Sequence, residues 1–282
     1  MNYWQNIYSH FDPVAFYVGS FGVHWYGIMY ATALLIAIVV AHWIVKKDNI
    51  PISSNMLDSY IIWVEIGVIV GARVGYILFY DSHTMYYLTH PWQIFNPFIN
   101  GVYAGISGMS YHGAVIGFIL ASLWWAKRNK VAFLFIVDIA TLAIPVGYIF
   151  GRIGNFFNQE LVGRVTDVPW AIYVNDILRH PSQLYEAVIE GLLVFLVLFY
   201  FRNKKKFDGQ IALMYLGLYS FGRIVAEFYR QPDIQLGFLY GTSWLTMGIL
   251  ISSVFLVLTI VLYFIITKNI KQKQSKKRKR SS

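Results

Sequence analysis

The sequence predicts an all-α integral membrane protein of about seven transmembrane helices, with its N-terminus outside, its C-terminus in the cytoplasm and a small extracytoplasmic head segment. Hydrophobic residues make up 57% of the 282 residues and charged residues only 13%, whereas soluble domains carry about 25% charged residues. Several apolar runs reach the roughly 20 residues that a spanning helix needs. Basic residues follow alternate runs, a pattern that the positive-inside rule explains.

Seven apolar runs mark the predicted spans. They cover residues 22–45, 57–80, 111–126, 131–150, 184–201, 211–229 and 243–267. No internal repeat of the transporter kind is visible in them. We therefore expect one polytopic membrane domain over residues 1–267, whose outer head segment is about 152–183, followed by a basic cytoplasmic tail over residues 268–282.

Lysine and arginine set the predicted orientation. The segments after spans one, three and five, together with the tail, contain 17 of the 23 basic residues. All four segments fall on one side of the membrane if the spans number seven, so that side is the cytoplasm. The tail alone contributes +8 of the net charge of +9. A basic run next to a final span is typical of orientation and of contact with anionic membrane lipids, so we expect no nucleic-acid partner.

The N-terminal stretch does not resemble a signal peptide, which opens with positive charge. The first basic residue is Lys46, and the opening 21 residues are rich in aromatic side chains that suit the membrane interface. Cysteine is absent, so the chain offers no disulfide, no zinc–thiolate site and no thiol nucleophile. Any thiol in its chemistry must belong to a partner.

Two predicted outer segments are long. Residues 81–110 contain no Lys or Arg and many aromatic side chains, so we expect them to lie in the interface or to re-enter the membrane. Residues 152–183 are polar, and 169–174 form a candidate short strand. Loops of this length are more often functional than idle.

Six basic residues fall outside the cytoplasmic segments, and all six are arginine. They are Arg73, Arg152, Arg164, Arg179, Arg223 and Arg230. The planar guanidinium group matches phosphate or carboxylate in two-point contacts that lysine cannot make. Membrane anchors and structural ion pairs would explain any one of them equally well, but they explain the six together less well.

The densest polar stretch runs from Gly151 to Gly163 and contains Arg152, Asn155 and Glu160. A helix end followed by a turn would explain its glycines. It would not explain charges at membrane depth, where each costs about 2.5–3.5 kcal/mol on insertion scales. The sequence therefore indicates a functional site at the outer end of span four.

A second polar group lies on span six. Arg223, Glu227 and Arg230 share one helix face because their offsets are four and seven residues. An ion-pair ladder would look the same. Arg223 has only one acid nearby in the sequence, so an anionic ligand is its expected partner.

Further titratable residues fall within the predicted spans or at their ends. His112 at the start of span three is a candidate base or proton relay, although a single His at a helix end is usually structural. The acids Glu65 and Asp138 lie within predicted spans and need partners. Arg152 is one possible partner of Asp138, although the fourteen residues between them amount to nearly four helical turns.

These residues resemble the bacterial phosphatidylglycerol–prolipoprotein diacylglyceryl transferases over nearly the whole chain. The family signature Gly-Arg-x-(Gly/Ala)-Asn-Phe-x-Asn-x-Glu-x-x-Gly is matched at every fixed position, by Gly151, Arg152, Gly154, Asn155, Phe156, Asn158, Glu160 and Gly163. The stretches His24-Trp25-Tyr26-Gly27 and His112-Gly113 and the group Arg223, Glu227 and Arg230 are similar to further family motifs. A match of this length is far more specific than a lone glycine motif.

The resemblance implies an enzyme of the bacterial cell membrane. It would move the diacylglyceryl group of phosphatidylglycerol onto the lipobox cysteine in the signal-peptide region of a prolipoprotein, giving a thioether and glycerol 1-phosphate. It implies no metal and no other cofactor. Carried over residue by residue, it makes His112, Arg152, Arg223 and Tyr26 catalytic and assigns substrate binding to Asn155, Glu160, Gly163, Glu227 and Arg230.

Three other functions compete with this one. A transporter or flippase for an anionic lipid would also use intramembrane arginines, but it predicts paired repeats. A structural assembly protein would not need costly charges inside the membrane. The run Gly105-Ile106-Ser107-Gly108 resembles the nucleophile motif of rhomboid proteases, but no histidine follows His180, and such a protease needs one on a later span.

Overall fold

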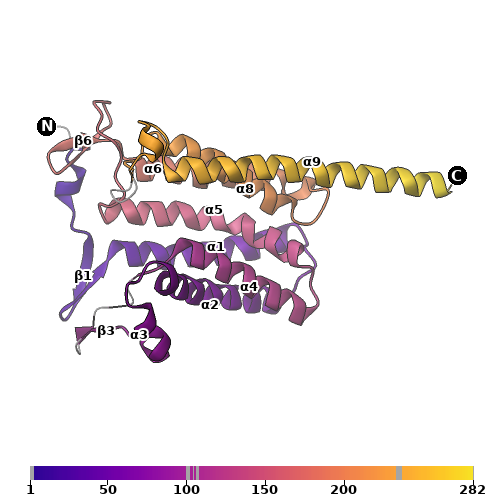
Figure 1. The fold of residues 1–282 in the computed structure, drawn as a ribbon, viewed down its shortest axis with the longest axis horizontal. Helices are drawn as coiled ribbons and strands as arrows, with labels where there is room; N and C mark the ends of the chain where they lie inside the picture. Colours follow the sequence, from indigo (N-terminus) through magenta and orange to yellow (C-terminus); the bar gives the residue numbers. More distant parts are fainter. Residues whose placement is uncertain (1–2, 100–101, 104, 106–107, 233–236, 282) are drawn as a thin grey trace. The chain divides into compact units, whose positions relative to one another are not determined.

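The computed structural model describes residues 3–99, 102–103, 105, 108–232 and 237–281, and most of them are helical (Figure 1). The long helices are α1 (Trp25–Lys47), α2 (Ser54–Phe79), α4 (Tyr111–Asn129), α5 (Phe133–Phe157), α8 (Gln210–Glu227) and α9 (Met247–Ser281). A further helix, Ser182–Lys204, joins α6 (Ser182–Glu186), the π-helical segment η3 (Ala187–Leu193), α7 (Val194–Phe201) and η4 (Arg202–Lys204). The short helices are η1 (Ile7–His10), α3 (Thr84–Thr89), η2 (Pro91–Gln93) and η5 (Leu239–Gly241).

A helix lies at each of the seven predicted spans. In the described part of the chain, five helices are long and apolar enough to cross a membrane: Trp25–Lys47, Ser54–Phe79, Phe133–Phe157, Ser182–Lys204 and Met247–Gln272. The two other helices, α4 and α8, have 19 and 18 residues. The prediction of a mostly helical membrane protein is therefore confirmed, whereas the count of seven spans stays a prediction.

The prediction of an all-α fold is wrong in detail, because three antiparallel hairpins accompany the helices. They are β1 (Val14–Val18) with β2 (Phe21–His24), β3 (Phe98–Ile99) with β4 (Val102–Tyr103), and β5 (Ile172–Val174) with β6 (Ile177–Arg179). Asn175 and Asp176 connect β5 to β6 at φ values of 50° and 63°. Asn and Asp tolerate this left-handed backbone, which two-residue hairpin turns require. The strand expected within 169–174 is confirmed for its last three residues.

Two predicted boundaries also move. The first helix begins at Trp25 and not at residue 22, because Gly22 to His24 pair with β1. Helix α5 continues to Phe157, so Arg152 and Asn155 lie on a helix and not in the outer loop where the head segment was expected to begin. In the 81–110 segment the structure has α3, η2, β3 and β4. Ile106 and Ser107 of the rhomboid-like run lie outside the described residues.

The chain divides into two compact units. Unit 2 is Val45–Val137. In it, α2 and α4 approach backbone to backbone: a Cβ atom added at Gly75 would lie 2.7 Å from Gly113 Cα, and one added at Gly67 would lie 2.5 Å from Ala121 Cβ. Small residues at these positions let the two helix backbones pack closely.

The buried side chain of Arg73 fastens part of the segment that follows α2 to this helix. Its Nε donates to the Ile94 carbonyl at 2.6 Å and its Nη1 donates to the Gly108 carbonyl at 3.2 Å. This arginine, one of the six singled out in the sequence, therefore has a structural role as a donor to two loop carbonyls.

Unit 1 combines Met1–Ile44 with Asp138–Ser282. Helices α8 and α9 run side by side in it (Figure 1). A small apolar core of Tyr8, Phe156 and Ile172 joins η1, the end of α5 and β5. Burial raises the pKa of Tyr8, although a hydrogen bond from Gln183 partly offsets this effect. The apolar core thus fixes the N-terminal segment against the head.

Asp138 of unit 1 lies at the opposite end of α5 from Arg152 and is 2% exposed. Its Oδ2 accepts hydrogen bonds from Lys205 Nζ at 3.1 Å and from the Gly209 amide at 2.9 Å, while its Oδ1 accepts one from the Ala212 amide at 3.0 Å. We call Asp138, Lys205 and these two amides the Asp138 cluster. The sequence predicted that Asp138 needs a partner, and that partner is Lys205 and not Arg152.

Candidate active site

Arg152 and Asn155 lie three residues apart in the last turns of α5, so their side chains are neighbours on one helix face. Arg152 Nε lies 3.0 Å from Glu186 Oε2 and donates to the Tyr148 hydroxyl at 2.8 Å. Arg152 Nη1 donates to Asn155 Oδ1 at 3.3 Å, and Asn155 Nδ2 donates to Glu160 Oε1 at 2.8 Å. Three of the predicted site residues, Arg152, Asn155 and Glu160, therefore form one continuous hydrogen-bonded chain.

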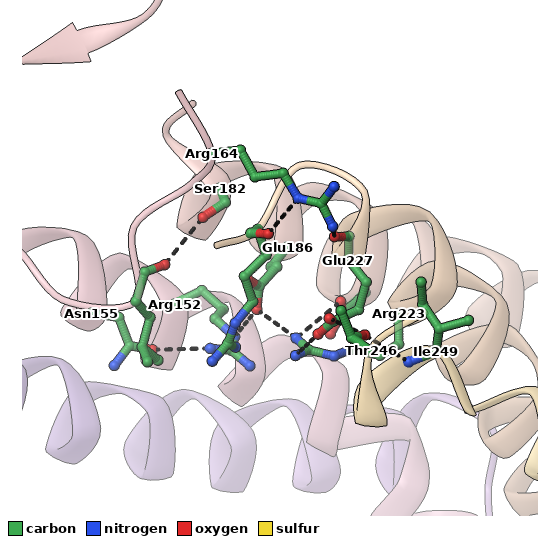
Figure 2. Close-up of polar contacts among 12 residues, drawn as sticks. Arg152, Asn155, Arg164, Ser182, Glu186, Arg223, Glu227, Thr246 and Ile249 are labelled. Atoms are coloured by element: carbon green, nitrogen blue, oxygen red, sulfur yellow. Dashed lines mark hydrogen bonds and ion pairs between the residues drawn. The ribbon is translucent and has the colours of Figure 1, made fainter. Parts of the chain in front are cut away.

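Glu186 joins the two central arginines of unit 1. Its Oε2 lies 3.0 Å from Arg152 Nε and 3.1 Å from Arg223 Nη1, and the residue is 0% exposed. In Figure 2 its carboxylate lies between the two guanidinium groups. A single buried carboxylate oxygen therefore sets the distance between the two cations, one from α5 and one from α8.

Arg223 on α8 contacts three acids. Besides Glu186, its Nη1 lies 3.8 Å from Glu190 Oε1, and its Nη2 donates to Glu227 Oε1 one turn along the helix. The prediction that Arg223 has only one acid nearby is wrong, because the helix Ser182–Lys204 brings two more glutamates against α8. The ion pair between Arg223 and Glu227 is the arrangement that the alternative, an ion-pair ladder, predicts.

Glu227 connects this group to the start of α9. Its Oε2 accepts a hydrogen bond from the Thr246 hydroxyl at 2.6 Å, and that hydroxyl accepts one from the Ile249 amide at 3.2 Å. Thr246 thus satisfies one of the free amides at the first turn of α9 while it holds Glu227 (Figure 2). We call Tyr148, Arg152, Asn155, Glu186, Glu190, Arg223, Glu227 and Thr246 the Arg152 cluster.

The arginines of this cluster can still be reached by a ligand. The side chains of Arg152 and Arg223 are each 14% exposed, whereas those of Glu186 and Glu190 are fully buried. Two guanidinium groups held from behind by buried carboxylates form a fixed donor array. Such an array suits the oxygens of a phosphate group and can stabilise negative charge that develops on them.

Gly163 and Arg164 contact the end of α8 and the residues that follow it. A Cβ atom at Gly163 would lie 2.6 Å from His180 Cβ and 2.8 Å from the Tyr229 carbonyl oxygen, so only glycine fits there. Arg164 donates to the carbonyls of Arg230 and Glu227, both at 2.9 Å. Gly163 therefore allows a close backbone approach, and its predicted substrate contact stays a prediction, as does that of Arg230.

Tyr26 lies on α1 against the same turn of α5 that carries Asn155. A Cβ atom at Gly154 would lie 3.3 Å from Tyr26 Cδ2 and 3.0 Å from Met29 Cβ. Tyr26 is 42% exposed. Gly154 lies within α5, so it allows helix packing and does not end the helix.

His112 lies in unit 2, at the first turn of α4. Its ring is exposed, and its Nδ1 lies 3.4 Å from the Tyr80 hydroxyl. Ser110 caps the helix by accepting a hydrogen bond from the Gly113 amide at 3.2 Å. The arrangement of His112 relative to the Arg152 cluster of unit 1 stays a prediction.

No sequence pattern predicted a role for Tyr148, Glu186, Glu190 or Thr246. Two of them could have been found, because Glu186 and Glu190 are carboxylates four residues apart at the start of an apolar run, where ionisable residues are costly and usually functional. Tyr148 and Thr246 carry no such signal. Within the described ranges, no group of three or more His, Asp or Glu side chains is arranged to hold a metal ion.

Comparison with known proteins agrees over nearly the whole chain. Residues 13–265 match the family model described as prolipoprotein diacylglyceryl transferase. A phosphatidylglycerol–prolipoprotein diacylglyceryl transferase of Aliarcobacter butzleri is 67% identical over 265 residues, which cover 94% of this chain and 97% of that protein. Proteins of the same name from Wolinella succinogenes and Campylobacter jejuni (strain 81-176) are 57% and 54% identical, each over 94% of this chain and 97% of their own length.

Proposed function

Since the chain belongs to the prolipoprotein diacylglyceryl transferase family, we propose that Arg152 and Arg223, the two arginines of the Arg152 cluster, bind the phosphate of phosphatidylglycerol and stabilise it as it leaves. The chain is a multi-pass protein of the bacterial cytoplasmic membrane, and it transfers the diacylglyceryl group from phosphatidylglycerol to the cysteine of a prolipoprotein. The observation that carries the assignment of the site is the pair of accessible arginines joined by Glu186.

The reaction makes a C–S bond and breaks a C–O bond. The cysteine sulfur attacks the glyceryl carbon that is bonded to the phosphate oxygen, and that oxygen leaves as part of glycerol 1-phosphate. The thiolate is the nucleophile, so the thiol proton has to leave the sulfur, while negative charge grows on the phosphate. Two fixed guanidinium groups would stabilise that charge where it develops. Every thiol in this scheme belongs to the substrate, which agrees with a chain that has no cysteine.

The remaining residues have supporting roles in this proposal. Asn155 and Glu160 orient the lipid headgroup next to Arg152, to which they are linked by hydrogen bonds. Tyr26 borders the same turn of α5. His112 takes the thiol proton or positions the lipid. Near-normal turnover of His112→Asn between about pH 6 and 9 would exclude the first of these two roles for His112, since an asparagine side chain cannot take the thiol proton.

The decisive experiment mixes the purified protein in detergent with phosphatidylglycerol and a synthetic lipobox peptide, and records the mass of the peptide. We expect a gain of one diacylglyceryl unit, which is lost when the peptide cysteine is replaced by serine. A transporter or flippase would leave the peptide mass unchanged. Unchanged mass with folded protein and bound lipid would overturn the proposed function and leave the arginines as a binding site only.

We also propose seven spans, with the N-terminus outside and the C-terminus in the cytoplasm. The distribution of Lys and Arg supports it. Because the chain has no cysteine, single cysteines can report on each side: Tyr3→Cys should react with a membrane-impermeant maleimide in intact cells, and Lys271→Cys only after lysis. The opposite labelling pattern would contradict this topology.

A further inference from the structure

Glu190 differs from the other carboxylates of the Arg152 cluster in what it contacts. Glu186 has two guanidinium nitrogens within 3.1 Å, and Glu227 has Arg223 Nη2 and the Thr246 hydroxyl. The Oε2 of Glu190 accepts a hydrogen bond from the Tyr148 hydroxyl, and Arg223 Nη1 lies 3.8 Å from its Oε1. Among the described residues, no group forms a hydrogen bond with that Oε1.

Close helix packing keeps water away from Glu190. The residue is 0% exposed and lies in the π-helical segment η3. A Cβ atom at the neighbouring Gly191 would lie 3.2 Å from the Pro145 carbonyl oxygen of α5. On the other side, a Cβ atom at Gly222 of α8 would lie 3.3 Å from Glu190 Cγ. Two glycines therefore let α5 and α8 close over the Glu190 side chain.

The charges around Glu190 do not balance if every acid is ionised. Arg152 and Arg223 supply two positive charges, and Glu186, Glu190 and Glu227 would supply three negative ones. Among the described residues, Tyr148 is a further titratable group next to Glu190, to which it donates a hydrogen bond. Tyr219 lies behind it, with its ring centroid 5.7 Å from that of Tyr148. The phosphodiester of the lipid would bring a further negative charge. Unbalanced charge in a buried site is costly, and such groups tend to neutralise.

We propose that Glu190 works in its uncharged form, as a positioning residue that holds Tyr148 and, through Tyr148, the guanidinium group of Arg152. The cluster then has two arginines facing two carboxylates, so it is neutral before the phosphate arrives. Glu190 does not touch the substrate. The proposal rests on the proposed function only in assigning the phosphate to the two arginines.

Paired substitutions test this assignment. Glu190→Gln keeps the size of the uncharged acid and an NH group in place of its OH, so we expect kcat and KM for phosphatidylglycerol within about threefold of the wild type, well under the tenfold that about 1.36 kcal/mol would produce. Glu186→Gln removes the charge that joins the two arginines, and we expect a loss of about 10- to 100-fold in kcat/KM, the range for a lost charged hydrogen bond. Equal losses in both variants would overturn the proposal.

An infrared spectrum of the wild-type protein provides a second readout that needs no turnover. We expect a protonated-carboxyl band that Glu190→Gln lacks and that Glu186→Gln and Glu227→Gln keep. If Glu190→Gln does not fold, persistence of the band in the other two variants still supports the proposal. Absence of the band from the wild type would overturn it. If the wild type fails to modify the peptide, the proposed function fails, and the infrared spectrum still decides the state of Glu190.

Discussion

Two buried polar clusters in unit 1 connect α5 to α8, and they satisfy their carboxylates to different degrees. In the Asp138 cluster both carboxylate oxygens accept hydrogen bonds, from Lys205 and from two backbone amides. In the Arg152 cluster, considering the described residues only, neither Glu186 Oε1 nor Glu190 Oε1 has a hydrogen-bond partner. Both of its arginine side chains also keep some exposure.

This difference distinguishes a structural cluster from the cluster that we propose to be functional. Buried polar groups are normally satisfied, so a fully bonded group such as Asp138 needs no explanation beyond stability. Incompletely bonded buried groups cost stability, and a catalytic role is one reason for which they are retained. Lys205 follows the structural pattern: burial lowers its pKa, but hydrogen bonds to Asp208 and Asp138 outweigh this and raise it. The two clusters should therefore respond differently to substitution.

Removing either arginine should have the largest effect. We expect Arg152→Ala and Arg223→Ala each to lower kcat about 10²- to 10³-fold, the usual cost of losing one donor to a developing oxyanion. Arg152→Lys should also lose most of its activity, because lysine cannot make the two-point contact. The matched control is Lys205→Arg in the Asp138 cluster, which should leave the activity unchanged. Turnover on the lipobox peptide measures both, and full activity of Arg152→Lys would remove the distinction between the clusters.

The Asp138 cluster should show the reverse behaviour. Asp138→Ala leaves Lys205 and two amides without their acceptor, and losing one member of a buried pair costs about 3–5 kcal/mol. Lys205 keeps Asp208 at 3.0 Å, so we expect the lower end of that range. Thermal unfolding in detergent measures the loss. Turnover per folded molecule should stay near the wild-type value; if it drops a hundredfold while the protein stays folded, Asp138 belongs to the functional cluster.

Gly163 tests how strongly packing around the head supports the Arg152 cluster. Gly163→Ala places a methyl group against the backbone of His180 and Tyr229, and overpacking of this kind costs about 1–3 kcal/mol. We expect a lower Tm and a moderate loss of activity, because Arg164 and the end of α8 must shift. Gly151→Ala is the matched control, since a Cβ atom there would meet no atom within 4 Å. Similar Tm values for the two variants would argue against the close approach at Gly163.

The smallest effect should be the pH dependence that His180 contributes. Burial lowers the pKa of His180, so between the folded-state pKa and the unfolded value near 6.5 the unfolded chain binds more protons. Stability then rises with pH: the contribution is complete above about pH 6.5 and is lost as the pH falls through the folded-state pKa. His180→Gln should flatten the Tm profile between about pH 5 and 7. An unchanged slope would show that other groups produce it.

The sequence predicted the membrane class, the helix positions and a polar site around Arg152. Composition and apolar run length determine the first two directly, and the motif from Gly151 to Gly163 indicated the third. Hairpins β1–β2 and β3–β4 were missed because strands of two to five residues carry little periodic signal, whereas a strand had been expected at β5. The contact between Tyr148 and Glu190 could not be predicted, because the two residues lie 42 positions apart in the sequence and only tertiary packing brings them together.

The π-helical segment η3 shifts the angular phase of the helix Ser182–Lys204. A regular α-helix turns about 100° per residue, and a π turn accommodates one extra residue in the same rise. A helical wheel drawn from Ser182 therefore points each side chain beyond Leu193 about one residue step away from its true direction. The side-chain directions of α6, which carries Glu186, and of α7 therefore follow two different helical wheels. Results of scanning mutagenesis along this helix should be plotted on a separate wheel for each side of η3.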